Sequence, residues 1–271
     1  MSETHLRQPR RVRHELKFRR ARVEAVEQLT PVLKRIVLTG DELEGFFSPG
    51  FDDHVKIFPA PRGQAVVLPT VSADGPVFAE PKPVARDYTP RAYDAANRRL
   101  TLDFAVGHGG PATAWAEDAR VGDELGLGGP RGSFLVPTSF AEHLLVGDEA
   151  AIPAIARRLE ELPAGARAVA CIEVTDASGE LALPSAAEVK IVWVHRNGGP
   201  RGRAEALTAA AVAAAGRIDP SDACVWVACE TSVARSMRAA LLAARAFNPK
   251  WMKVAGYWRL GRAGAHEVIE D

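Results

Sequence analysis

Residues 85–93 read Ala-Arg-Asp-Tyr-Thr-Pro-Arg-Ala-Tyr, and this stretch decides how the first half of the chain is interpreted. In an extended segment the side chains of Arg86 and Tyr88 lie on one face, because side chains alternate along a strand. Thr89 points the other way unless the chain bends, and the following Pro90 favours a bend. The stretch therefore predicts a bent strand that presents one guanidinium and two hydroxyl groups to a ligand.

The guanidinium of Arg86 suits a pyrophosphate, because its planar fork matches two phosphate oxygens better than an ammonium group does. With the two hydroxyl groups beside it, the stretch indicates a binding site for a flavin dinucleotide. An edge strand with solvated arginines and a half-buried tyrosine explains the same residues about as well, since a four-residue motif recurs by chance. Both interpretations stay open on these residues alone.

The sequence around this stretch contains several short strand patterns with no helix between them. They cover residues 21–28, 32–39, 53–59 and 99–106, and a further strand pattern at 124–127 ends this half of the chain. Residues 59–83 hold many prolines and glycines, which indicates either a mobile loop or a partly ordered insert. Closely spaced strands without helices predict an antiparallel barrel or sandwich for the first half of the chain.

A second candidate phosphate site follows the strand predicted over residues 99–106. Its sequence is His108-Gly109-Gly110-Pro111-Ala112-Thr113. Glycines followed by a proline are typical of a turn that opens a helix. Free N–H groups at a helix start bind phosphate, and the glycines let a ligand approach the backbone. An ordinary glycine-capped turn is an equal alternative, whereas two phosphate-competent elements on neighbouring strands favour a ligand site.

After about residue 140 the pattern changes to apolar runs that alternate with helical segments. The runs cover residues 143–147, 166–174, 189–194 and 224–228, and the helical segments cover 150–162, 204–215 and 232–246. This alternation predicts a parallel sheet buried on both faces. Ligands of such sheets bind beyond the carboxyl ends of the strands. The three-glycine dinucleotide fingerprint is missing from the sequence, which argues against an ordinary dehydrogenase domain.

Composition limits the function further. The chain has 271 residues, with Lys plus Arg and Asp plus Glu both at 34, so its charge does not suggest a nucleic-acid partner. Residues 7–22 are rich in arginine without an apolar run behind them, which predicts a solvated basic arm rather than a secretory signal. No stretch approaches the roughly 20 apolar residues of a membrane helix. Three cysteines, Cys171, Cys224 and Cys229, read as reduced core residues of a cytoplasmic protein.

Taken together, the motifs resemble those of the siderophore-interacting protein family of ferric-siderophore reductases, which belongs to the ferredoxin reductase-like flavoproteins. The resemblance covers residues 17–264 and rests on the ordered segments 53–56, 86–91, 108–112, 128–132, 147–149, 152–155 and 256–259. It implies a six-stranded antiparallel Greek-key β-barrel that binds FAD in residues 1–140, followed by an α/β nicotinamide-binding domain in residues 141–271. It also implies electron flow from NADPH or NADH through FAD to siderophore-bound iron(III), with no metal bound by the protein.

The resemblance carries over to individual residues. By this resemblance Arg86 neutralises the FAD pyrophosphate, Tyr88 contacts the flavin and ribityl region, and Thr89 reaches the reactive edge of the ring. The other implied FAD residues are Arg91, His108, Gly109, Gly110, Pro111, Ala112 and Thr113. The residues implied to flank the nicotinamide dinucleotide are Gly147, Asp148, Glu149, Arg196 and Glu230. Tyr257 and Trp258 would cover the flavin face or pack between domains.

Four basic residues near the C-terminus, Lys250, Lys253, Arg259 and Arg262, could attract an anionic ferric siderophore or could simply be solvated. The chain also departs from the family pattern at two positions. Ala150 replaces a usual threonine and Cys229 replaces a usual glycine, and we expect both to adjust dinucleotide binding rather than abolish it.

Two alternative functions stay open. One is a general NAD(P)H:flavin or ferredoxin-type reductase without siderophore preference, and the other is a binding protein that carries siderophore or flavin without turnover. A ferredoxin is the alternative electron donor. We expect a monomer.

Overall fold

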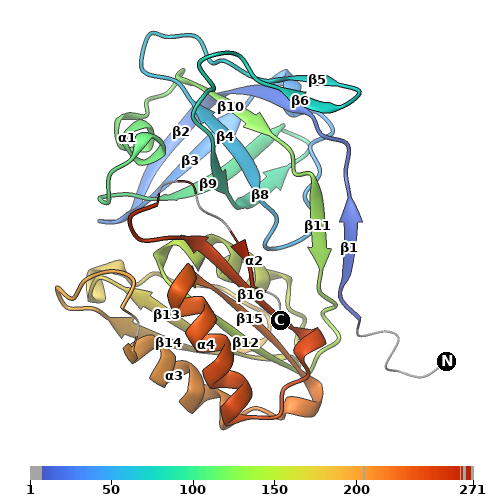
Figure 1. Cartoon of the computed structure of the whole chain (residues 1–271), viewed down its shortest axis with the longest axis vertical. Helices are drawn as coiled ribbons and strands as arrows, with labels where there is room; N and C mark the ends of the chain where they lie inside the picture. Colours follow the sequence, from blue (N-terminus) through green and yellow to red (C-terminus); the bar gives the residue numbers. More distant parts are fainter. Residues whose placement is uncertain (1–7, 204, 263, 265–266, 270–271) are drawn as a thin grey trace. The chain divides into compact units, whose positions relative to one another are not determined.

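The bend expected at Thr89 divides the stretch 86–93 into two strands. In a computed structural model of the chain these are β7 (Arg86–Tyr88) and β8 (Pro90–Asp94). The structure describes residues 8–203, 205–262, 264 and 267–269. They form two units, one spanning Arg11–Leu135 and one beginning at Val136 (Figure 1).

The first unit is an antiparallel sheet that closes on itself. Its other long strands are β2 (Phe18–Thr30), β3 (Leu33–Thr39), β4 (Val55–Pro59), β9 (Arg99–Ala105) and β10 (Glu124–Gly128). The order across the seven strands is β7-β4-β10-β2-β3-β9-β8, so β7 and β8 lie at opposite ends of the sheet. Because these two strands are consecutive in the chain, one bent segment joins both edges. Counted as one strand, they give a six-stranded near-barrel, as the family resemblance implies.

The connections in this sheet are those of a Greek key. β3 and β4 follow each other in the chain without pairing, and β10 returns to lie between β4 and β2. The apolar residues of the strands point to one side and form the core. In the β3–β9 pair, Ile36 lies opposite Leu102 and Leu38 lies opposite Leu100, and all four are fully buried.

The segment between β4 and β7 is a partly ordered insert. Within it β5 (Thr70–Ser72) pairs with β6 (Gly75–Val77). A Cβ atom at Gly126 would lie 2.5 Å from the Leu68 side chain and 2.7 Å from that of Val66, so the insert packs directly on β10. The sequence allowed either a mobile loop or a partly ordered insert for residues 59–83. This packing favours the partly ordered insert.

Three smaller elements complete the first unit. They are β1 (Arg10–Arg13), which pairs with β11 (Gly132–Leu135), the 3₁₀ turn η2 (Asp41–Leu43) and helix α1 (Pro111–Asp118). The arm predicted for residues 7–22 is solvated only in its first part, where Arg10, Arg11 and Arg13 are exposed in the short strand β1. Its last part was predicted wrongly, because β2 begins at Phe18 and Arg19 is buried there.

The second unit contains the predicted parallel sheet. Its strands are β12 (Glu142–Gly147), β13 (Arg167–Val174), β14 (Glu188–His195), β15 (Ala223–Glu230), β16 (Met252–Trp258) and β17 (Glu267–Val268). The order is β14-β13-β12-β15-β16-β17, and only the β16–β17 pair is antiparallel. The helices are α2 (Ile152–Glu161), α3 (Glu205–Ala215) and α4 (Thr231–Ala244), and the 3₁₀ turns are η3 (Glu149–Ala151), η4 (Ala177–Gly179), η5 (Pro220–Asp222) and η6 (Pro249–Trp251).

The strand order reverses between β12 and β15. The connection from β12 through α2 runs one way across the sheet, and the connection from β15 through α4 runs the other way. Right-handed crossovers therefore put α2 and α4 on opposite faces. Leu144, Val146 and Val227 pack with α3 and α4 in one core. In open α/β sheets a ligand binds at such a reversal, beyond the carboxyl ends of the two strands.

None of the helices in the described part of the chain combines the length and the apolar character that a bilayer crossing requires.

Candidate functional site

The first unit brings its two predicted phosphate elements together through a row of aromatic rings. The Tyr88 ring lies 4.3 Å from the Phe104 ring, and the Phe104 ring lies 5.8 Å from that of Trp115 in α1. β8 pairs with β9, and the glycine segment follows β9 directly. The row thus connects the Arg86 strand to helix α1.

Arg86 lies at the start of β7 and has no acidic partner among the described residues. Its Nη1 donates to the carbonyl oxygen of its own neighbour Ala85 at 2.8 Å. Thr89 lies between β7, which pairs with β4, and β8, which pairs with β9, and it is 7% exposed. Burial raises the pKa of the Tyr88 hydroxyl, so this group stays a neutral hydrogen-bond donor. The bend thus leaves one guanidinium available to a ligand beside two hydroxyl groups.

Arg91 is placed differently from Arg86. Its Nε lies 3.9 Å from Oδ2 of Asp103, a buried carboxylate that also accepts two hydrogen bonds from Arg35. The Arg91 side chain therefore belongs to an ion cluster between β8, β9 and β3. Of the two arginines that the sequence proposes for FAD, Arg86 is the one without a carboxylate beside it.

Helix α1 begins with an open backbone. Its N-cap is Gly110, with φ of 102°, and no side chain caps the helix. Gly109 has φ of 74°, and a Cβ atom at either glycine would meet no atom within 4 Å. Thr113 is 2% exposed and its hydroxyl lies 3.4 Å from both ring nitrogens of His108. Uncapped N–H groups in open space fit an anionic group such as a diphosphate.

These donors fit a flavin dinucleotide. An arginine without an acidic partner and an uncapped helix start supply the fork and the N–H groups that a pyrophosphate accepts, and exposed left-handed glycines keep side chains away from it. The fit rests on Arg86 and on residues 108–113.

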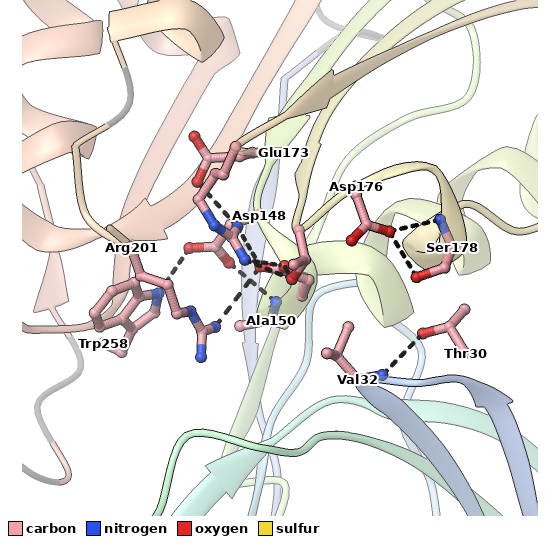
Figure 2. A network of polar contacts seen from close by, with 12 residues as sticks. Thr30, Val32, Asp148, Ala150, Glu173, Asp176, Ser178, Arg201 and Trp258 are labelled. Carbon is pink, nitrogen blue, oxygen red and sulfur yellow. Dashed lines mark hydrogen bonds and ion pairs between the residues drawn. The ribbon is translucent and has the colours of Figure 1, made fainter. Parts of the chain in front are cut away.

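In the second unit, the carboxyl ends of the strands carry a cluster of buried charges (Figure 2). Asp148 follows β12 directly, and its Oδ1 accepts a hydrogen bond from the Ala150 N–H at 3.0 Å. Its Oδ2 accepts one from the Trp258 indole N–H at 2.7 Å. Burial raises the pKa of Asp148, which is 4% exposed. Two of the predicted residues, Asp148 and Trp258, are therefore partners.

Arg196 is fully engaged with protein carboxylates. Its Nη1 donates to Glu149 at 2.9 Å and to Glu173 at 3.2 Å, and its Nη2 donates to the Thr175 hydroxyl at 3.0 Å. The Arg196 side chain is 8% exposed, and those of Glu149 and Glu173 are 3% and 5% exposed. Burial raises the pKa of Glu173 to about 7, although Arg196 opposes the shift. Arg196 thus links the ends of β12, β13 and β14.

Glu230 occupies the start of α4. Its carboxylate accepts hydrogen bonds from the N–H groups of Ser232 at 2.6 Å and Val233 at 3.1 Å. Burial alone would raise the pKa of Glu230, but these hydrogen bonds hold it below its ordinary value. The backbone donors that begin α4 therefore serve a protein carboxylate, as the Ala150 N–H does with Asp148.

The two departures from the family pattern have different surroundings. The Cys229 side chain is 2% exposed and lies in the core with Val227 and Ala234, on the side of α3 and α4. Burial raises the pKa of its thiol. Ala150 is half-buried within η3. Cys229 therefore fills core space below the sheet end.

Gly147 allows the sheet end to pack closely. A Cβ atom at Gly147 would lie 2.3 Å from the Cβ of Ala151 and 2.7 Å from the Ala228 carbonyl oxygen. Only a glycine lets η3 fold back over the end of β12 at this position.

The predicted substrate residues fall into two pairs. Arg259 and Arg262 are exposed and close a tight turn after β16, in which the Arg262 N–H donates to the Arg259 carbonyl at 3.1 Å. Lys250 and Lys253 lie at the amino end of the same strand, roughly 20 Å away by strand geometry. Tyr257, half-buried in β16, packs against the ring of Trp226 at 5.9 Å. The structure brings together the arginines and separates them from the lysines.

Two residues at the carboxyl ends of the parallel strands, here called the rim, were not identified from the sequence. Glu173 is a carboxylate inside an apolar strand, a pattern that points to a buried partner. Arg201 lies in the loop after β14, within the pentapeptide Gly-Gly-Pro-Arg-Gly of residues 198–202, which repeats that of residues 128–132. The repeat is the feature that could have drawn attention to Arg201. The described residues contain no cluster of three or more His, Cys, Asp or Glu residues that could hold a metal ion.

Comparison with known families gives two matches that together cover most of the chain. Residues 22–134 match the siderophore-interacting FAD-binding domain, and residues 140–261 match the siderophore-interacting protein family.

The chain is also similar to individual proteins. A protein of Escherichia coli (strain K12) named NADPH-dependent ferric-chelate reductase is 37% identical over 93% of this chain and 97% of its own length. A siderophore utilization protein from T. fusca is 36% identical, and its crystal structure superposes with a TM-score of 0.86 over 95% of this chain and 98% of that one. The ferredoxin reductase in carbazole 1,9a-dioxygenase shares the fold, with a TM-score of 0.63 and 19% identity over 88% of this chain and 69% of that one.

Proposed function

Because the chain belongs to the siderophore-interacting protein family, we propose that it is a ferric-siderophore reductase, which transfers electrons from NADPH through FAD to siderophore-bound iron(III). The observation that carries the proposal is the donor set in the first unit. Arg86 lacks an acidic partner, and the start of α1 lacks a cap, within a domain that matches an FAD-binding family. The similarity to an NADPH-dependent ferric-chelate reductase over nearly the whole chain supports the same reaction.

In this proposal the first unit holds the cofactor and leaves one edge of it reachable. Arg86 and the N–H groups at the start of α1 bind the pyrophosphate, while Tyr88, Thr89, Arg91 and residues 108–113 surround the rest. When bound, FAD supplies the conversion of a two-electron hydride donor into single electrons. The protein binds and orients FAD and the substrates, so electron transfer needs no general acid or nucleophile from the protein.

The second unit is proposed to take the nicotinamide dinucleotide at the reversal between β12 and β15. Gly147, Asp148, Glu149 and Glu230 form this edge, and Trp258 adds an aromatic face fixed by its hydrogen bond to Asp148. Arg196 connects the strand ends of this edge through its hydrogen bonds to Glu149 and Glu173.

The chemistry of the substrate explains why one electron suffices. Hard oxygen ligands hold iron(III) much more tightly than iron(II), so reduction loosens the chelate. We propose that Arg259 and Arg262 attract the anionic chelate, because their exposed guanidinium groups have no carboxylate partner in the described residues. Leu260 between them is 68% exposed, and a long apolar side chain there suits a chelator with a hydrophobic frame.

Four finer points belong to the same proposal. We propose that residues 1–140 bind FAD and residues 141–271 the dinucleotide, that the protein acts as a monomer in the cytoplasm, and that NADPH rather than a ferredoxin is the donor. The division into two domains and the nicotinamide donor follow from the family resemblance, and the cytoplasmic location follows from three cysteines that read as reduced core residues.

An anaerobic titration of the purified protein tests the function. We expect flavin absorbance that bleaches with NADPH and recovers on addition of a ferric siderophore, while an iron(II) trap changes colour in proportion. Flavin that stays oxidised with NADPH would contradict the proposal and favour a ferredoxin donor or a binding protein. Equal rates with simple iron chelates would favour the general reductase instead.

A further inference from the structure

Arg201, in the second unit, is held by an aromatic contact and a long ion pair, and no hydrogen bond of its side chain is found among the described residues. It lies in the loop between β14 and α3, and its guanidinium carbon sits 5.1 Å from the centre of the Trp258 ring. Trp258 is itself fixed by its hydrogen bond to Asp148 (Figure 2). This cation–π contact therefore holds the guanidinium near the Trp258 ring before any ligand binds.

The donors of Arg201 remain available. Its nearest carboxylate oxygen is Oε2 of Glu149, at 3.7 Å from Nη2, which is an ion pair beyond hydrogen-bond distance. Its Nε is buried and has no hydrogen-bond partner among the described residues. This buried N–H is out of a ligand's reach, so the donors that a ligand can use are those of the two Nη atoms. The side chain is 27% exposed, so a ligand can reach the fork.

The loop around Arg201 is shaped to keep it there. Gly202 has φ of 78°, and a Cβ atom at this position would lie 3.3 Å from Cγ of Glu230 and 3.4 Å from the Trp258 ring. The glycine thus lets the loop lie close over the end of β15, beside the reversal in the sheet. Arg201 is therefore positioned at the edge where a dinucleotide would bind.

Several other candidate phosphate donors described at this edge already serve protein groups. Arg196 is committed to Glu149, Glu173 and Thr175. The Ala150 N–H serves Asp148, and the N–H groups that begin α4 serve Glu230. A phosphate arriving here needs a cation with free donors, and Arg201 supplies one.

We propose that Arg201, rather than Arg196, binds a phosphate group of the nicotinamide dinucleotide. The inference rests on the proposed function, because it takes NADPH as the donor. The guanidinium keeps its cation–π contact with Trp258 and donates N–H groups of its two Nη atoms to oxygens of one phosphate. That phosphate is either the 2′-phosphate or one of the diphosphate pair, and both present two acceptor oxygens to the fork.

Calorimetric titration of the FAD-loaded, oxidised protein with NADP⁺ and with NAD⁺ tests the proposal without turnover. Arg201→Ala should weaken NADP⁺ binding at least tenfold, because a tenfold loss of affinity is roughly what the loss of one charge-assisted hydrogen bond causes. Arg203→Ala removes an exposed arginine two residues away and should stay within twofold of the wild type. A loss confined to NADP⁺ identifies the 2′-phosphate, and an equal loss with both dinucleotides identifies the diphosphate.

Arg201→Lys keeps the charge of the cluster but removes the planar guanidinium fork. We expect it to bind NADP⁺ clearly more weakly than the wild type, with an unchanged melting temperature and FAD content. Wild-type affinity in either Arg201 variant would overturn the inference and leave the reductase proposal standing. A wild-type protein that binds neither dinucleotide would overturn both.

Discussion

Arg196 and Glu149 form a buried ion pair in which both Nη atoms of the arginine donate to the two carboxylate oxygens, Nη1 at 2.9 Å. The same Nη1 reaches Glu173 at 3.2 Å. One guanidinium therefore compensates two carboxylates that come from the end of β12 and from β13. Desolvation works against the charge of Arg196, but the two glutamates raise its pKa above the ordinary value.

Arg196→Ala is expected to destabilise the protein by about 3–5 kcal/mol, because it leaves Glu173 without its cation and Glu149 with only the longer ion pair to Arg201. Chemical unfolding followed by tryptophan fluorescence measures the loss. Arg22→Ala is the matched control, since Arg22 pairs with Glu124 at 2.6 Å but its side chain is 63% exposed, and such pairs contribute about 0–1 kcal/mol. Similar losses in the two variants would contradict the structural role of Arg196.

Gly147→Ala is expected to destabilise the second unit by about 1–3 kcal/mol, the usual cost of overpacking. The new methyl group would lie 2.3 Å from the Cβ of Ala151, so η3 must shift. Gly216→Ala is the control, because a Cβ there meets its nearest atom, the Ala213 carbonyl oxygen, at 3.4 Å. The melting temperatures of both variants measure the difference. An unchanged melting temperature for Gly147→Ala would show that the close approach of η3 to β12 does not require a glycine.

Sequence reasoning found the elements whose signals are local. The bend at Thr89 follows from alternation plus a proline, and the four predicted strands of the parallel sheet are continuous apolar runs. β16 was not named as a strand, because Lys253 and Gly256 interrupt its apolar run. Gly256 is needed there since a Cβ would lie 2.3 Å from the Thr231 hydroxyl.

The roles of the two arginines of the rim could not be predicted in the same way. Whether Arg196 is committed or free depends on Glu149 and Glu173, which come from other strands and meet it only in the folded sheet. The same holds for the start of α4, whose N–H groups look open in the sequence but are taken by Glu230. Tertiary pairing of charges, unlike strand or helix periodicity, leaves no spacing in the sequence.

Glu173→Gln is expected to change how stability depends on pH. Burial raises the pKa of Glu173 to about 7 in the folded protein, above the ordinary value of 4.5, while Asp148 and Glu149 add to the shift and Arg196 opposes it. Folding is therefore favoured by the protonated form, and the wild type loses stability as pH rises from 4.5 to 7, by up to about 1.4 kcal/mol per pH unit.

The glutamine variant should lose less stability over this range, because its amide oxygen still accepts from Arg196 but does not titrate. Unfolding midpoints measured at intervals across the range provide the comparison. Parallel curves for the two proteins would mean that Glu173 stays ionised throughout.

The double variant Arg259→Ala/Arg262→Ala is expected to raise KM for an anionic ferric siderophore several-fold with little change in kcat, because the exposed arginines attract substrate without touching the reacting atoms. High salt should shrink the difference, since solvent-exposed charges are screened. Lys250→Ala/Lys253→Ala removes the same charge from the other end of β16 and should leave KM near the wild-type value. A larger effect of the lysine pair would move the substrate site to that end.

Arg86→Ala is expected to lose FAD. The guanidinium has the Ala85 carbonyl as its partner and no carboxylate among the described residues, so its charge is available to a pyrophosphate. Loss of a charge-assisted hydrogen bond costs about 1.5–3 kcal/mol, which corresponds to roughly 10- to 150-fold in affinity. The ratio of flavin to protein absorbance after purification, and titration of the apoprotein with FAD, measure this loss.

The control variant is Arg99→Ala, which removes an arginine paired with Glu24 at 2.9 Å and should keep its flavin. If Arg86→Ala purifies fully loaded, the pyrophosphate must lie elsewhere, and the start of α1 becomes the next place to test.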